Sequence, residues 1–178
     1  LFWSTAVTAH TPFGGLTAAV SPDGKTIVAG GDNRTLYVID AQTMAIQKRI
    51  WLQTTIWGLH FNKSGTKLIV EDTKYNLHLL DGATFKTEKK VEKAGFLSPA
   101  RNADVSATLD RSYKGHTITI RDLTSLSAKR TIPFTKEQKV SSFGLNPTGT
   151  KLAVLFEGKK DSSEPLNRKV PREFKGVD

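Results

Sequence analysis

The chain alternates short apolar stretches with turns rich in glycine, proline, asparagine and aspartate. Thr26–Ala29 and Thr35–Ile39 are two such stretches, and Gly30-Gly31-Asp32-Asn33 separates them. Stretches of this length, rich in β-branched and aromatic residues and bounded by turn residues, are typical of β-strands. No segment shows the longer period of an amphipathic helix, so the pattern predicts an all-β fold.

The same pattern repeats along the chain. The turn glycines Gly24 and Gly65 are 65 − 24 = 41 positions apart, and an aspartate closes an extended stretch at Asp40, Asp81 and Asp122, again 81 − 40 = 41 and 122 − 81 = 41 positions apart. A period between 20 and 50 residues indicates a fold built from repeated supersecondary units.

Aligned on this period, each unit is predicted to contain four short strands, here called a to d. The predicted strands are a at 16–20, 56–61, 95–99 and 141–145, b at 26–29, 67–70, 105–109 and 151–156, c at 35–39, 76–80 and 117–121, and d at 45–52, 85–91 and 128–134. Strands b and c carry apolar residues on both faces, so both faces must be covered. Strand d is polar and lysine-rich, as suits an outer edge. Four-stranded antiparallel sheets repeated radially form a β-propeller, and we expect a partial one with a period of about 41 residues.

The turn between strands a and b has a recurrent form. In three units this turn begins with Ser or Asn and ends with Gly, as type I turns prefer: Ser21-Pro22-Asp23-Gly24, Asn62-Lys63-Ser64-Gly65 and Asn146-Pro147-Thr148-Gly149. The third unit has Arg101-Asn102-Ala103-Asp104, which matches the type I preference less well. We expect Gly24, Gly65 and Gly149 to have structural roles, with φ above zero at Gly24 and Gly65.

These residues resemble a known family. Val20-Ser21-Pro22-Asp23-Gly24 followed by Val38-Ile39-Asp40 is similar to a WD-repeat blade, and Leu36 to Thr43 resembles equally the YVTN blades of bacterial and archaeal surface proteins. The resemblance covers residues 4 to about 156, and it implies that His10 and Asp32 form a structural pair. The tryptophan of the WD pattern is replaced by Ile39, Leu80 or Arg121.

The predicted organisation is an arc. Residues 1–11 would supply the outer strand of a closing or preceding blade, 12–53, 54–93 and 94–135 would be blades, 136–156 the first half of a fourth blade, and 157–178 a polar insertion between strands. An arc leaves apolar faces open at both ends, so we expect the remaining blades of the same protein, or another chain, to cover them.

Composition excludes several classes of function. The chain has no cysteine, hence no disulfide, thiolate metal site or cysteine nucleophile, and no apolar run near 18 residues that would predict a membrane span. Gly24-Lys25-Thr26 is not a phosphate-binding loop, because Ala19 stands where the first glycine is needed and no helix follows. The cellular compartment stays open.

Catalytic and metal-binding patterns are not found either. The four histidines lack metal-ligand spacing, and there is no Gly-x-Ser-x-Gly elbow. Asp32, Asp72 and Asp110 recur once per unit in the b–c turns, as structural residues do. We therefore predict no catalytic residues, no metal and no cofactor.

Charge is unevenly distributed. Residues 86–156 contain 13 Lys and Arg against 6 Asp and Glu, so most of the net charge of +9 lies there. The b–c turns and d–a loops share one end of each blade, where the sequence places Arg34, Lys74, Tyr75, Arg111, Tyr113 and Lys114. Basic residues mixed with aromatics predict binding of a protein, or of an anionic partner, although a solvated rim has the same composition. The expected function is a non-catalytic scaffold; the alternative is the propeller portion of a larger enzyme.

Overall fold

The structure is a computed structural model that describes residues 15–112, 115–157 and 172–175. It is all-β in these ranges, and no described helix is long and apolar enough to cross a membrane. The predicted strand at 1–11, together with His10, Tyr113 and Lys114, lies outside the described residues. The strands are β1 (Thr17–Val20), β2 (Thr26–Gly30), β3 (Thr35–Asp40), β4 (Ile46–Trp51), β5 (Ile56–Phe61), β6 (Lys67–Asp72), β7 (Leu77–Asp81), β8 (Thr87–Val91), β9 (Phe96–Pro99), β10 (Val105–Ser112), β11 (Gly115–Asp122), β12 (Ala128–Pro133), β13 (Val140–Leu145), β14 (Lys151–Phe156) and β15 (Arg172–Lys175).

The strands pair only with their sequence neighbours. They form three four-stranded sheets, β1-β2-β3-β4, β5-β6-β7-β8 and β9-β10-β11-β12, and one three-stranded sheet, β13-β14-β15, all antiparallel. The fold class predicted from the sequence is confirmed: each unit is an up-and-down sheet. The polar, lysine-rich strands β4, β8 and β12 are edges, as predicted.

The fourth sheet has one strand more than the sequence predicts. Only two strands are expected there, followed by a polar insertion, yet β15 pairs with β14 from Lys151↔Lys175 to Val154↔Arg172. The sequence Arg172-Glu173-Phe174-Lys175 holds three charged residues and one aromatic, so it lacks the apolar alternation by which a strand is recognised.

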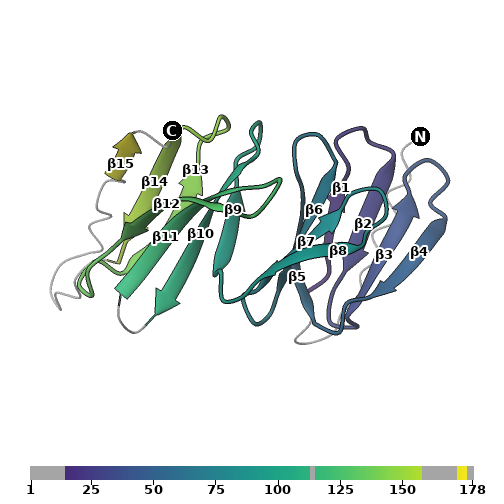
Figure 1. The fold of residues 1–178 in the computed structure, drawn as a ribbon, viewed down its shortest axis with the longest axis horizontal. Coiled ribbons are helices and arrows are strands. Elements are labelled where there is room, and N and C mark those ends of the chain that lie inside the picture. Colours follow the sequence, from purple (N-terminus) through teal and green to yellow (C-terminus); the bar gives the residue numbers. More distant parts are fainter. Residues whose placement is uncertain (1–14, 113–114, 158–171, 176–178) are drawn as a thin grey trace, which may run out of the picture.

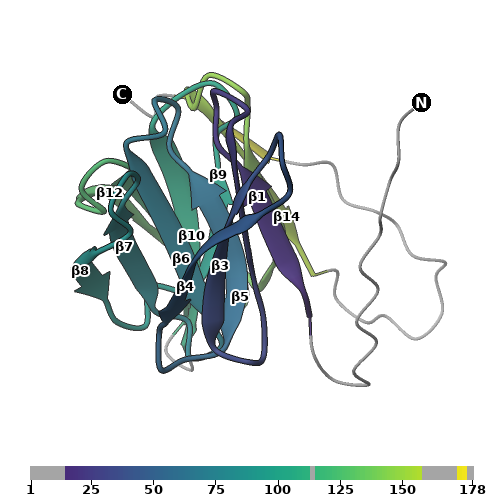
Figure 2. The same ribbon diagram turned by 90° about the vertical axis from the view of Figure 1, so that its right-hand side faces the viewer.

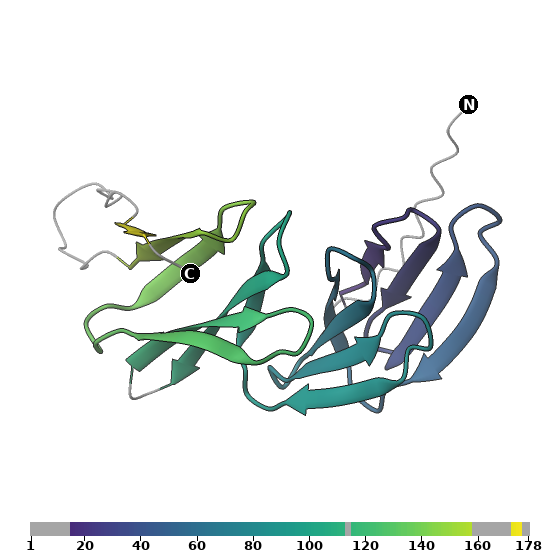
Figure 3. The same cartoon turned by 45° about the horizontal axis from the view of Figure 1, so that its top comes forward.

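The four sheets follow one another in chain order as an open arc (Figures 1 and 3). Seen along the long axis, they lie one behind another (Figure 2). Strands β1, β5, β9 and β13 begin the sheets, and β1 lies against β5 as β9 lies against β13.

Apolar side chains fill the three spaces between neighbouring sheets. Leu68 and Val70 of β6 pack toward the first sheet, whereas Ile69 between them packs toward the third. A third cluster, which includes Ile118 and Leu152, joins the third and fourth sheets. Because successive side chains of a strand point to opposite faces, a strand covered on both sides is apolar throughout, as the sequence predicts for strands b and c.

The a–b turns take the predicted form. The N–H groups of Gly24, Gly65 and Gly149 donate to the carbonyls of Ser21, Asn62 and Asn146 over 2.9, 3.0 and 2.9 Å. Their φ values are 71°, 73° and 72°, which confirms the left-handed conformation predicted for Gly24 and Gly65.

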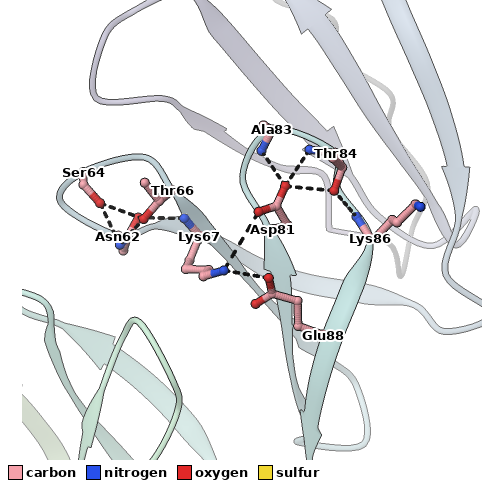
Figure 4. A network of polar contacts seen from close by, with 9 residues as sticks. All are labelled: Asn62, Ser64, Thr66, Lys67, Asp81, Ala83, Thr84, Lys86 and Glu88. Carbon is pink, nitrogen blue, oxygen red and sulfur yellow. Dashed lines mark hydrogen bonds and ion pairs between the residues drawn. The ribbon is translucent and has the colours of Figure 1, made fainter.

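A polar network closes the same end of the second sheet (Figure 4). The fully buried Asn62 accepts a hydrogen bond from the Lys67 N–H (2.9 Å) and donates to Ser64 and Thr66. Asp81, at the end of β7, accepts from the N–H and the hydroxyl of Thr84, each over 2.8 Å. These side chains satisfy backbone groups that the strand ends leave unpaired.

Candidate aromatic and basic binding surface

The turns between the second and third strands, and the loops between sheets, lie at the same end of each sheet. Strand pairing places Arg34 in the first sheet, Lys74 and Tyr75 in the second and Arg111 in the third. Arg34 and Tyr75 occupy the left-handed region, with φ of 60° and 63°, at equivalent turn positions 75 − 34 = 41 residues apart. We call the end that carries these residues, with Trp51, Trp57, Lys93 and Phe96, the aromatic-basic end.

The turn that carries Lys74 and Tyr75 is built around a buried carboxylate. Asp72 is 3% exposed and accepts hydrogen bonds from the N–H groups of Lys74 (2.8 Å) and Asn76 (2.9 Å). Its second oxygen accepts from the Asn76 amide (2.8 Å) and faces His78 Nε2 at 2.9 Å. Burial opposes ionisation of Asp72, but the hydrogen bonds from His78 and Asn76 outweigh it and hold the pKa of this carboxyl below its ordinary value.

The loop between β8 and β9 is fixed to the same turn. The Lys93 N–H donates to the Asn76 side-chain oxygen (3.0 Å), and the Gly95 N–H donates to the Tyr75 carbonyl (3.2 Å). Asp72 therefore fixes its own turn directly, and Asn76 links that turn to the loop that leads into the third sheet.

Three side chains from two sheets contact one another at this point. The rings of Tyr75 and Phe96 meet edge to face, with centroids 5.0 Å apart, and the Arg111 guanidinium lies 5.3 Å from the Phe96 centroid. Arg111 also donates a hydrogen bond to the Ser141 carbonyl of the fourth sheet, over 3.0 Å. Of the predicted residues, Lys74, Tyr75 and Arg111 line one cavity. Arg34 lies in the first sheet, where its carbonyl accepts a hydrogen bond from the Leu52 N–H.

Two exposed tryptophans extend this surface, and the sequence did not identify them. Trp51 ends β4 opposite Thr35 and is 60% exposed; Trp57, near the start of β5, is 62% exposed. Ile56 pairs with Asp72 and Gly58 with Glu71, so Trp57 is the extra residue of a β-bulge. A bulge changes the direction of its side chain, which leaves this indole in solvent.

The other titratable groups predicted to be structural differ in burial. Asp32 and Asp110, which lie in the corresponding turns of the first and third sheets, are both exposed. His60 faces Glu71 at 2.8 Å, and the other Glu71 oxygen accepts from the Leu97 N–H of the third sheet (2.9 Å), so this pair links two sheets. Within the described ranges, no three His, Cys, Asp or Glu side chains are grouped so as to hold a metal ion.

The structure is similar to solved β-propellers. It aligns with the β-propeller domain of Cps50 (Swd1) from Myceliophteria thermophila at TM-score 0.60 and 18% identity, over 79% of this chain and 49% of that one. It aligns with hydrazine synthase from Kuenenia stuttgartiensis at TM-score 0.64 and 14% identity, over 84% and 45%. No protein-family model and no curated protein matches the chain.

These similarities agree with the arc of antiparallel sheets and define the class of protein: the chain has the β-propeller fold. The arc described above is a partial propeller, and the chain spans about half the length of the solved structures it matches.

Proposed function

We propose that this chain is a non-catalytic β-propeller scaffold that binds a protein partner at its aromatic-basic end. The observation that carries the proposal is the exposure of Trp51, Trp57 and Tyr75 at the same end of the first two sheets, at 60%, 62% and 50%. Tryptophan, tyrosine and arginine dominate the energetics of protein interfaces. The two aromatic side chains bury a large area and, having only two side-chain torsions, lose little conformational entropy.

The order of the underlying backbone also supports a binding role. Tyr75 sits in a turn fixed by four contacts of Asp72, and Trp57 is presented by a bulge within the sheet. A side chain that is already positioned loses less entropy on binding, so more of its contact energy contributes to affinity.

We propose a non-catalytic role because the two buried carboxylates of the described residues, Asp72 and Glu71, are both engaged in structural hydrogen bonds. His78 and Asn76 hold Asp72 within a turn, and Leu97 and His60 hold Glu71 between two sheets. Each carboxylate therefore has a structural role in positioning backbone.

We further propose that the blades are of the WD-repeat or YVTN type. Support comes from the aspartates that end the third strand of each sheet: Asp40, Asp81 and Asp122 accept hydrogen bonds from Thr43, Thr84 and Thr124. The same device thus closes the third-to-fourth strand turn in three successive sheets.

Site-specific photo-crosslinking tests the binding role. A photoreactive amino acid would replace Trp57 in the complete protein, expressed in its own cells, and the crosslinked products would be identified by mass spectrometry. Met44 is the matched control, since it is exposed to a similar extent, 58%, in the turn at the opposite end of the first sheet. One recurrent protein captured at position 57 and not at 44 is expected; equal capture at both positions would contradict the proposal.

A further inference from the structure

A small cavity lies between the second and third sheets at the aromatic-basic end. Its volume is about 360 Å³, and its lining includes Lys74, Tyr75, Lys93, Phe96, Asp110 and Arg111. Ligand pockets range from about 300 to 1,000 Å³, so this one accepts one or two side chains and no extended surface.

The cavity has an apolar part and a fixed cation. The edge-to-face pair of Tyr75 and Phe96 provides the apolar surface, and the Arg111 guanidinium lies over the Phe96 ring. One N–H of Arg111 is bonded to the Ser141 carbonyl. A guanidinium has five N–H donors in a rigid plane, which leaves others to receive a carboxylate.

The cavity also has an excess of positive charge. Among the described residues, Lys74, Lys93 and Arg111 have no carboxylate within ion-pair distance, in contrast to Lys67, which pairs with Glu88 over 2.6 Å. Asp110 is the one carboxylate of the lining, so the formal balance is three positive charges against one. Unpaired cations around a concave apolar surface attract an anionic group and strengthen its binding.

We propose that this cavity binds an acidic peptide segment of a partner protein, with a carboxylate at Arg111, Lys74 and Lys93 and a neighbouring apolar side chain against Tyr75 and Phe96. This inference rests on the proposed function and names the chemistry of the partner. A nucleic acid fits less well, because Arg111 covers a face of Phe96 that a base would need for stacking.

Binding of a defined acidic probe tests the proposal. The probe is a fluorescein-labelled hexapeptide of alternating glutamate and phenylalanine, titrated with the complete protein and followed by fluorescence anisotropy. Arg111→Glu and Lys93→Glu should each weaken binding by about tenfold or more, because each replaces an attraction with a repulsion. The double variant Lys74→Glu, Arg111→Glu should also flatten the salt dependence of binding.

The matched control is Lys86→Glu. Lys86 is exposed in the turn at the opposite end of the second sheet (Figure 4), and its reversal makes the same change of net charge. We expect its affinity for the peptide to stay within about twofold of the unmodified protein, since surface charges separated by more than about 10 Å are screened. Circular dichroism of every variant would show whether the fold is retained. Lys93 is exposed and takes no part in the contacts of Tyr75, Phe96 and Arg111, so Lys93→Glu tests the charge of the cavity without disturbing those contacts.

Three results would overturn the proposal. They are the absence of saturable binding, an equal loss for Lys86→Glu and Lys93→Glu, and tighter Arg111-dependent binding of single-stranded DNA than of the peptide. None of them decides the proposed scaffold role, which the crosslinks at Trp57 test separately.

Discussion

The Asp104 carboxylate accepts a hydrogen bond of 2.6 Å from the backbone N–H of Lys63, which lies one repeat earlier, 41 residues away. On its other side, the N–H of Asn102 donates to the Pro147 carbonyl of the fourth sheet over 2.8 Å. The third a–b turn, which lacks the glycine of the others, is therefore tied to the equivalent turns of both neighbouring sheets. These contacts link successive blades outside their apolar interfaces.

The Asp104 contact should contribute measurably to stability. Asp104→Ala removes a charged acceptor and leaves the Lys63 N–H unpaired, so we expect a loss of about 1 kcal/mol in the free energy of unfolding. Asp104→Asn keeps an acceptor oxygen and should lose less. Urea denaturation of the three proteins measures this order, and identical midpoints would show that the bond does not link the sheets.

The glycines of the a–b turns should not tolerate β-branched residues. Valine at Gly24, Gly65 or Gly149 should cost about 1 to 3 kcal/mol, because φ near 70° strains it. The loss should be smallest at Gly24, where a Cβ would meet nothing within 4 Å, since at Gly65 it would lie 3.2 Å from Pro22. Gly144→Ala, whose Cβ would have one neighbour at 4.0 Å, is the control. Denaturant melts without loss at all three turn positions would contradict this explanation.

The sequence predicted the features that repeat. These features are the 41-residue period, the turn glycines and the apolar strands covered on both faces. They depend on local sequence patterns that recur in successive units, so a strand or turn predicted in one unit is supported by the same pattern in the next. Strand β15 was not predicted, because its residues do not alternate between apolar and polar. It is recognised as a strand only by its pairing with β14.

The residues of the aromatic-basic end were identified from the sequence only in part, for a similar reason. Turn position identified Lys74, Tyr75 and Arg111, but the contact of Arg111 with Phe96 depends on how two sheets pack. The exposure of Trp57 depends on a bulge, which changes the strand register by one residue and which alternation alone does not reveal.

The Asp72 network should be costly to remove. Asp72→Ala leaves the buried Asn76 and the partly buried His78 without their acceptor and releases the turn that carries Lys74 and Tyr75. We expect a loss of about 2 to 4 kcal/mol. Asp32→Ala, at an exposed aspartate in the corresponding turn of the first sheet, should lose clearly less. Thermal melts compare the two, and equal losses would mean that burial of Asp72 is not what makes it structural.

Stability should fall in acid through the aspartates of the third-to-fourth strand turns. Partial burial of Asp122 raises its pKa, but hydrogen bonds from Thr124 and the Lys129 ammonium outweigh this and lower the pKa from its ordinary 3.8 to about 2. Because the folded pKa lies below the unfolded one, the stabilisation is fully present above about pH 4 and is lost as the pH falls from 3.8 towards 2. Asp40 and Asp81 have pKa values lowered by the N–H groups of Thr43 and Thr84, so they should act in the same direction.

Urea midpoints measured between pH 6 and 2 test this dependence. Asp122→Asn removes the titrating group and should reduce the acid-induced loss. An identical pH profile for the protein and Asp122→Asn would show that this carboxylate does not contribute.

The chain forms an open arc of propeller blades (Figure 1), and we expect a further partner to cover the outer faces of the first and fourth sheets. On the fourth sheet, Ala153 and Leu155 are exposed, Leu155 by 36%, while Leu152 and Val154 on the other face are buried. Light scattering of residues 1–178 alone, combined with thermal melting and binding of a dye that reports apolar surface, tests the claim most directly. We predict concentration-dependent association and dye binding. A compact monomer that melts cooperatively and binds no dye would contradict the account.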